Sequence, residues 1–177
     1  MTRHSGGLQL LAGNNMPMAV EPSTAEFARL FDMLASNFRY VVVDASSRMD
    51  ATTRLVCNLS QTVLMVATTD VACMWSASRI QHYLGDAGGK EKFQLVLNRF
   101  RKIPGFRESD AETASGMRVL WKIPNHYFAV SSAIDRGVPV MSHSSSEIAR
   151  AFSGLAARLT ENDLDVKRKA WSLFKSV

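Results

Sequence analysis

Apolar runs of strand length alternate with segments of helical period along most of this sequence. Thr62–Thr68 and Lys92–Asn98 are runs of strand length, whereas Val71–Leu84 carries the apolar spacing of a helix. This alternation is typical of βαβ units and predicts a parallel sheet. In chain order, the sequence predicts strands at 8–12, 40–43, 62–68, 92–98 and 118–124, and helices at 23–38, 49–59, 71–84, 108–117, 126–137 and 144–159.

The predicted strands are apolar on both faces, so both faces of the sheet have to be covered. Helices joined by right-handed crossovers provide this cover in an α/β, doubly wound, mostly parallel sheet, which is the fold class that we expect. The chain has 177 residues, of which 46% are hydrophobic. This length and composition suit about one domain with a substantial core.

Charge, cysteine content and hydropathy restrict the expected partners and cellular compartment of the protein. The net charge of +5 and the isoelectric point near 9.5 would suit an acidic partner, but the basic residues are dispersed except near the C-terminus. Cys57 and Cys73 lie in apolar-periodic segments without metal-ligand spacing, which favours core thiols. No apolar run reaches the roughly 18 residues that a membrane span needs, and the N-terminus lacks a signal-peptide core. We therefore expect a cytoplasmic protein.

Polar side chains follow four of the predicted strands. Because ligands bind outside the carboxyl ends of parallel strands, these residues are candidates for a shared site. Each residue alone is typical of an ordinary loop, and only the set favours a ligand site. The candidates are Asp44 with Ser46, Thr69 with Asp70, Asn98 with Arg99, and Asn125 with His126.

The order of several segments resembles the second half of the MinD/ParA-type deviant-Walker ATPases. The closest likeness is to the CpaE/TadZ branch, which positions Flp (tight-adherence) pilus assembly at the bacterial cell pole. The start of the chain, TRHSGGLQLLAG, also resembles that branch, so the likeness covers residues 2–159. The segments that carry it are YVVVDAS, TVLMVATTD, FQLVLNRFRK, WKIPNHYFAVSSAIDRGVPV and EIARAFSGLAARL.

This resemblance implies a P-loop NTPase-like fold with ATP and Mg²⁺ as cofactors. It implies that Asp44 is the Walker B carboxylate, which holds Mg²⁺ through water. It also implies that Asn98, with Arg99 beside it, reads the adenine edge through its amide. Pro124 and Asn125 would form the loop that closes over the base.

The family's phosphate-binding loop, which ends in Gly-Lys-Thr/Ser, is absent from this sequence. The run LGDAGGKEKF has the wrong glycine spacing, precedes a strand and has Glu91 in place of the Mg²⁺-ligating Ser/Thr. We expect Gly85–Gly89 to be a helix stop and turn instead. Either the chain is the back half of a longer protein, or it is a degenerate scaffold. Both interpretations leave a sheet edge exposed to a partner.

We expect residues 1–160 to form a partial ATPase-like domain and residues 161–177 to form a basic amphipathic tail. The tail either packs on its own domain or contacts the inner membrane. Ser144 and Glu147 have the spacing of a capping box at the start of the preceding helix.

The function implied by the resemblance is polar localisation in Flp pilus assembly, without ATP hydrolysis by this chain alone. The expected partners are pilus-assembly proteins and a second copy of the chain, bound through the exposed sheet edge. The expected location is the bacterial cytoplasm, at the pole or the membrane periphery. Two alternatives remain: an active ATPase completed by a P-loop from another chain, and a ParA-like partition protein that binds DNA non-specifically. Nucleic-acid binding is the less favoured, because aromatic and basic residues do not interleave.

Overall fold

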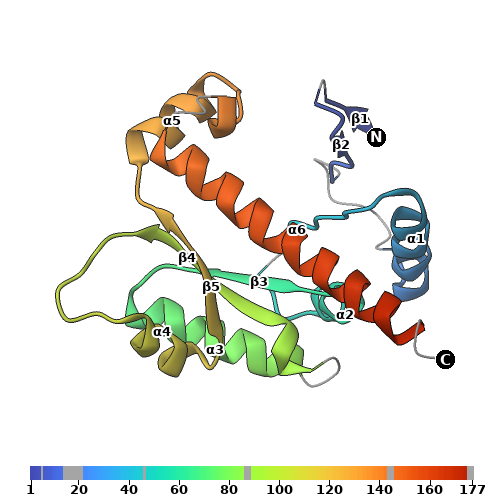
Figure 1. The fold of residues 1–177 in the computed structure, drawn as a ribbon, viewed down its shortest axis with the longest axis horizontal. Coiled ribbons are helices and arrows are strands. Elements are labelled where there is room, and N and C mark those ends of the chain that lie inside the picture. The colour runs from blue at the N-terminus through green and yellow to red at the C-terminus, as the bar shows by residue number, and fades with distance from the viewer. Residues whose placement is uncertain (5, 14–21, 46, 86–88, 143–145, 175–177) are drawn as a thin grey trace. The chain divides into compact units, whose positions relative to one another are not determined.

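The computed structural model describes the whole chain except residues 5, 14–21, 46, 86–88, 143–145 and 175–177, and for residues 161–174 it describes only the backbone. The chain divides into two compact units, Met1–Asp44 and Ala45–Val177. The second unit contains the parallel sheet and most of the helices (Figure 1).

The described residues of the first unit form a small hairpin and one helix. Strands β1 (Thr2–Arg3) and β2 (Gln9–Leu10) pair antiparallel in a two-stranded sheet of their own. The strand expected at Leu8–Ala12 is therefore shorter than predicted and does not belong to the parallel sheet. Helix α1 (Thr24–Asn37) begins with a capping box between Ser23 and Glu26, as its sequence predicts.

The strand expected at Tyr40–Val43 is not formed. This segment has neither helical nor strand structure, and the side chain of Val42 is 93% exposed. A strand exists only when a neighbouring strand takes its backbone hydrogen bonds, and no strand pairs with this segment within the described residues. The apolar composition of the run was therefore insufficient to make it a strand.

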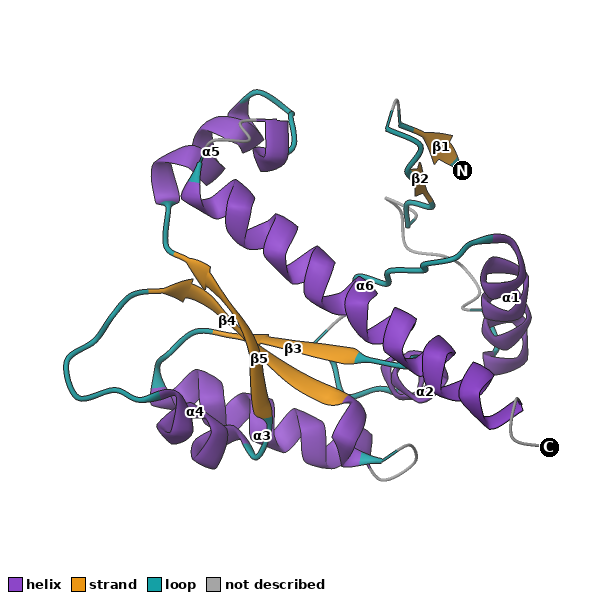
Figure 2. Ribbon diagram, in the orientation of Figure 1, coloured by secondary structure: helices purple, strands orange, loops and turns teal. Residues whose placement is uncertain are grey.

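In the described part of the second unit, the parallel sheet consists of three strands in the order β3-β4-β5 (Figure 2). Strand β3 (Val63–Ala67) pairs with β4 (Phe93–Phe100), which pairs with β5 (Arg118–Pro124). The connections between them contain α3 (Val71–Leu84), the short 3₁₀ turn η2 (Lys90–Lys92) and α4 (Glu108–Ser115). The βαβ alternation predicted from the sequence is thus confirmed.

Helices cover both faces of this sheet, so the predicted α/β class is confirmed. One core cluster joins Leu95 and Leu97 of β4 to residues of α2 (Ala51–Leu59), α3 and α4. The other joins Val96 of β4 and Ile123 of β5 to Ile148 of the C-terminal helix. Successive side chains of a strand point to opposite faces, which explains why adjacent β4 residues enter different clusters.

Helix ends follow local sequence signals in most cases. Asp50 and Asp70 cap α2 and α3 by accepting hydrogen bonds from backbone N–H groups in the first turn. The C-cap of α3 is Gly85, as predicted for a helix stop. Helix α5 (Tyr127–Asp135) ends just before Gly137, which has a φ of 62° that glycine accommodates readily.

The last helix, α6 (Glu147–Phe174), follows the short 3₁₀ turn η3 (Val140–Ser142) and runs past the end predicted at residue 159. The predicted capping residue Ser144 lies outside the described residues. Among the described residues, Ser146 caps α6, because its Oγ accepts a hydrogen bond from the Ala149 N–H at 3.2 Å. No helix in the described part of the chain has the length and apolarity needed to cross a membrane.

Candidate functional site

The carboxyl ends of β4 and β5 lie side by side and form the candidate site, which we call the carboxyl rim. Phe100 of β4 pairs with Pro124 of β5. The Asn125 N–H then donates a hydrogen bond to the Phe100 carbonyl at 3.0 Å, which joins the loop after β5 to the end of β4. The structure therefore brings together two of the four sequence segments that were predicted to share a site.

A β-bulge at Asn98 and Arg99 shapes this rim. Leu97 pairs with Lys122 and Phe100 with Pro124, so two β4 residues lie opposite the single residue Ile123. Arg99 takes up the extra length with a φ of 50°, which is uncommon for a residue with a side chain. The Asn98 Oδ1 accepts a hydrogen bond from the Arg99 N–H at 2.9 Å. Bulges of this kind redirect side chains and are common beside functional sites.

Asn125 is held by a residue that the sequence analysis did not select. In the amide orientation that satisfies its neighbours, the Asn125 Oδ1 accepts hydrogen bonds from Nε of Arg101 at 2.6 Å and from one of its terminal nitrogens. A guanidinium group is suited to such a two-pronged contact because its N–H groups form a rigid fork. The sequence offered one signal for this role of Arg101: the residue lies in LNRFRK, shortly after the end of the predicted strand 92–98.

The polar residues after β3 are engaged in local structure. The Asp70 Oδ1 accepts a hydrogen bond from the Cys73 N–H at 2.8 Å, and the Thr68 hydroxyl donates to the other carboxylate oxygen. These two hydrogen bonds lower the pKa of the Asp70 carboxyl below its usual value, and the bond from Thr68 has the larger effect. Because both oxygens are already used, Asp70 is primarily a helix cap.

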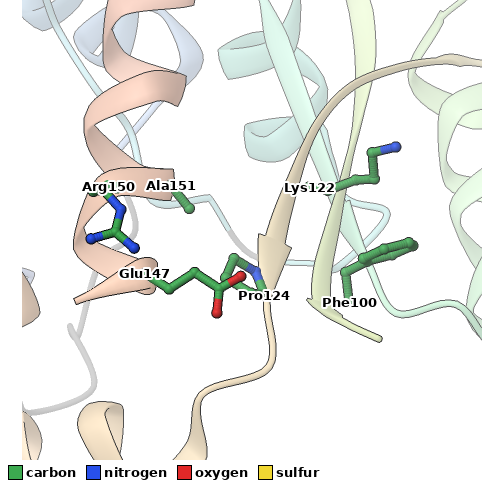
Figure 3. A pocket seen from close by; sticks show the side chains of 6 residues that line it. All are labelled: Phe100, Lys122, Pro124, Glu147, Arg150 and Ala151. Carbon is green, nitrogen blue, oxygen red and sulfur yellow. The ribbon is translucent and has the colours of Figure 1, made fainter. Parts of the chain in front are cut away.

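A shallow, open cavity of about 390 Å³ lies beside the carboxyl rim. Phe100 and Lys122 line one side of it, Pro124 lies at the end of β5, and α6 supplies the other side (Figure 3). Lys122 forms an ion pair with Glu108, and its Nζ lies 5.4 Å from the Phe100 ring centroid. The cavity is lined by Phe100, Lys122, Pro124, Glu147, Arg150 and Ala151.

Three further predicted site residues are Asp44, Ser46 and His126. Asp44 belongs to the first unit and is exposed, so its place relative to the carboxyl rim stays a prediction. His126 is exposed at the N-terminus of α5, and its side chain makes no capping hydrogen bond. Ser46 lies outside the described residues. Among the described residues, no group of three or more His, Cys, Asp or Glu side chains could hold a metal ion.

Within the described residues, the carboxyl rim carries two amide side chains and no glycine-rich phosphate-binding loop. Asn98 and Asn125 offer amide groups that can hydrogen-bond to a heterocycle. No described loop has the glycine-rich sequence that places several backbone N–H groups around a phosphate. Lys90 lies in η2, which directly precedes β4. It therefore lies at the amino ends of the strands, whereas the carboxyl rim lies at their other ends.

Comparison with solved structures identifies proteins of similar fold. The MinD cell division protein of Aquifex aeolicus matches with a TM-score of 0.70 at 16% identity, over 78% of this chain and 61% of that protein. A ParA family ATPase from Chlorobium tepidum matches with a TM-score of 0.68 at 16% identity, over 78% and 57% of the two chains. The Pyrococcus furiosus cell division ATPase MinD matches with a TM-score of 0.66 at 19% identity, over 78% and 59%.

These matches establish the fold of the chain as the α/β fold of the MinD and ParA ATPases. This chain spans about three fifths of the length of the solved proteins that it matches. No protein-family model matches the sequence, and no curated protein matches it.

Proposed function

We propose that this chain is a MinD/ParA-like localisation and interaction factor of the CpaE/TadZ branch, acting in Flp pilus assembly. Its fold supports the MinD/ParA part of the proposal. The pilus branch rests on the sequence segments that resemble CpaE/TadZ. In this proposal the chain binds the base end of a nucleotide and does not hydrolyse ATP on its own.

The observation that carries the base site is the hydrogen bond between the Asn125 N–H and the Phe100 carbonyl at 3.0 Å. It ties the loop containing Pro124 and Asn125 to the strand end containing Asn98 and Arg99. In the proposal, Asn98 hydrogen-bonds to the edge of the base, while the Pro124–Asn125 loop packs against it.

The absence of hydrolysis follows from what phosphoryl transfer requires. The transition state is stabilised by backbone N–H groups, a lysine and Mg²⁺ arranged around the β- and γ-phosphates. The sequence contains no G-x-x-x-x-G-K-[ST] loop to provide them. Asp44 alone could hold Mg²⁺ through water, but it could not hold the phosphates.

The free edge of β3 supports association with a partner strand. Within the described residues, β3 pairs only with β4, and the Val66 side chain is 62% exposed. Val63–Ala67 contains no charged residue or proline that would oppose pairing. We assign this edge to a second copy of the chain or to a pilus-assembly protein. A MinD protein of this fold has been solved in complex with MinC, so a protein of similar fold binds a protein partner.

Hydrolysis and nucleotide binding are tested together on the full chain. We expect no phosphate release above a buffer blank, and calorimetry should show that adenosine binds no more weakly than ATP. Phosphate release that is abolished by Asp44→Ala but retained in the control Asp32→Ala would contradict the proposal. Asp32 is a suitable control because it is an exposed carboxylate in the same unit.

The cellular role is tested by localisation. A fluorescent fusion, expressed in a bacterium that assembles Flp pili, should form foci at the cell pole. Diffuse fluorescence throughout the cytoplasm would argue against the pilus assignment while leaving the base site untouched. Removal of residues 161–177 from the fusion then distinguishes a membrane-binding tail, whose loss releases the protein, from a structural one.

A further inference from the structure

A second cavity, of about 310 Å³, lies between the carboxyl end of β4, the loop that follows it and the start of α4. Neither Asn98 nor Asn125 lines it, so it is separate from the contacts of the proposed base site. Its volume is near the lower end of the range for small-molecule sites, which suits a ligand about the size of one large side chain. The cavity is lined by Leu97, Phe100, Lys102, Phe106, Glu108 and Lys122.

The apolar part of this cavity is held in place by the core. Leu97 is fully buried, and Phe100 and Phe106 are partly buried against the same core cluster. The Phe106 N–H donates a hydrogen bond to the Ile103 carbonyl at 3.2 Å, which closes a turn in which Gly105 has a φ of 79°. A turn with glycine at this position has a defined geometry, so the apolar surface exists before any ligand binds.

The charged part of the cavity carries one more positive charge than negative. Lys122 forms an ion pair with Glu108, with 2.5 Å between Nζ and Oε2, so these two charges offset each other. Lys102 is exposed, and it forms no ion pair within the part of the chain that the structure describes. The surrounding loop, 99–107, contains three further basic residues and no acidic one. The local potential therefore favours an anion.

We propose that this cavity binds an apolar carboxylate, a molecule in which a carboxylate lies a few bonds from an aromatic or branched aliphatic group. The apolar group packs against Phe100 and Phe106, and the carboxylate accepts a hydrogen bond from Nζ of Lys102. A free organic acid has this chemistry, and so does the C-terminal residue of a peptide chain. This inference goes beyond the proposed function and does not depend on nucleotide binding.

Two probes of equal size isolate the charge, namely 3-phenylpropionate and its neutral amide, 3-phenylpropionamide. Each is titrated into the full chain and followed by NMR of the backbone amides. We expect the signals of Leu97, Lys102 and Phe106 to shift, with a dissociation constant for the acid of about 1 mM, because the ligand has few atoms. The acid should bind about fivefold more tightly than the amide, the upper end for a solvent-exposed ion pair.

A third probe distinguishes the two sources of the carboxylate. N-acetyl-phenylalanine carries the peptide group that precedes a C-terminal residue, whereas 3-phenylpropionate does not. Tighter binding of N-acetyl-phenylalanine identifies a chain end as the ligand. Equal or weaker binding identifies a free acid.

Substitutions then test the role of each part of the cavity. Lys102→Ala should bring the acid-to-amide affinity ratio close to one, and Lys102→Glu should make the amide the tighter ligand. The matched control is Lys90→Ala, which removes an exposed lysine at the amino ends of the strands and should leave the ratio unchanged. Phe106→Ala should weaken both probes without changing their ratio. Thermal melting confirms folding, and Phe106→Leu, with a smaller loss of affinity, replaces Phe106→Ala if that variant does not fold.

The contradicting results are also distinct from one another. Equal binding of the acid and the amide by the wild-type chain overturns the proposal, because the cavity then does not select a carboxylate. A preference for the acid that survives Lys102→Ala overturns the role of Lys102. The absence of saturable shifts with either probe overturns the cavity as a ligand site and leaves the proposed base site untouched.

Discussion

Trp121 of β5 and Gly154 of α6 are packed so closely that a side chain at position 154 has no room. A Cβ atom added to Gly154 would lie 2.8 Å from Cη2 of the Trp121 ring, and closer still to its neighbour Cζ2. The ring cannot easily withdraw, because its Nε1 donates a hydrogen bond to the Ala151 carbonyl at 2.8 Å. This contact packs α6 against one face of the sheet.

Replacing Gly154 by alanine should therefore destabilise the protein. In an exposed helix the same change would be stabilising by about 1 kcal/mol, because glycine is a poor helix former. Here the added methyl group overpacks the contact with Trp121, so we expect a net loss of about 1–3 kcal/mol in the free energy of unfolding. Urea denaturation measures this loss.

The Trp121→Phe background provides the control for Gly154→Ala. Phenylalanine lacks the indole atoms nearest to position 154, so the cost of the alanine should shrink in this background. An equal cost in both backgrounds would mean that Trp121 is not the source of the effect.

Asp70 should contribute to stability in a pH-dependent manner. Its folded pKa lies below the usual 3.8, first because the Thr68 hydroxyl donates to it and then because the Cys73 N–H does. The contribution is therefore fully present above the unfolded pKa and is lost as the pH falls through the folded pKa. Asp70→Ala should lower the melting temperature at neutral pH and by a smaller amount in acid.

Asp70→Asn is the matched variant, because asparagine caps helices without titrating. It should retain most of the melting temperature at neutral pH and flatten its dependence on pH in the acid range. A melting temperature of Asp70→Ala that equals that of the wild type at neutral pH would show that this cap does not stabilise α3.

The two cysteines should differ in reactivity. Cys57 lies in the core with 5% of its surface exposed, and burial raises the pKa of its thiol, although the charge of Lys92 opposes that shift. Cys73 is only half-buried. Because the thiolate is the reactive form, iodoacetamide should modify Cys73 first in the native protein and Cys57 only after unfolding. The variant Cys73→Ser leaves Cys57 as the single thiol, so mass spectrometry of this variant measures the labelling rate of Cys57 alone. Rapid labelling of the native variant would contradict the prediction.

Arg99 should respond to substitution according to its backbone conformation. Its φ of 50° is costly for residues with a side chain and least tolerable for those branched at Cβ. Arg99→Val should therefore destabilise the protein by about 1–2 kcal/mol, the usual cost of the left-handed conformation. Arg99→Gly, which relieves the strain, should be at least as stable as Arg99→Ala in thermal melts. A more stable valine variant would show that the bulge does not depend on this conformation.

Much of the second unit was predictable because its signals are local. The limits of α3 and β5 were predicted to the residue, since Asp70, Gly85 and Pro124 act within their own segments. The apolar runs of β3, β4 and β5 required cover on both faces, and this requirement determined the α/β class.

Local sequence signals predict most helix limits, the three paired strands and which residues lie at their carboxyl ends, because capping and periodicity act between near neighbours. Long-range contacts, by contrast, explain why Tyr40–Val43 is unpaired among the described residues, why Asn98 and Arg99 form a bulge, and why Arg101 holds Asn125. The physical reason is that strand pairing, register and side-chain partners depend on residues distant in the chain. Tyr40–Val43 and Val63–Ala67 are both apolar runs, but among the described residues only Val63–Ala67 pairs with a neighbouring strand.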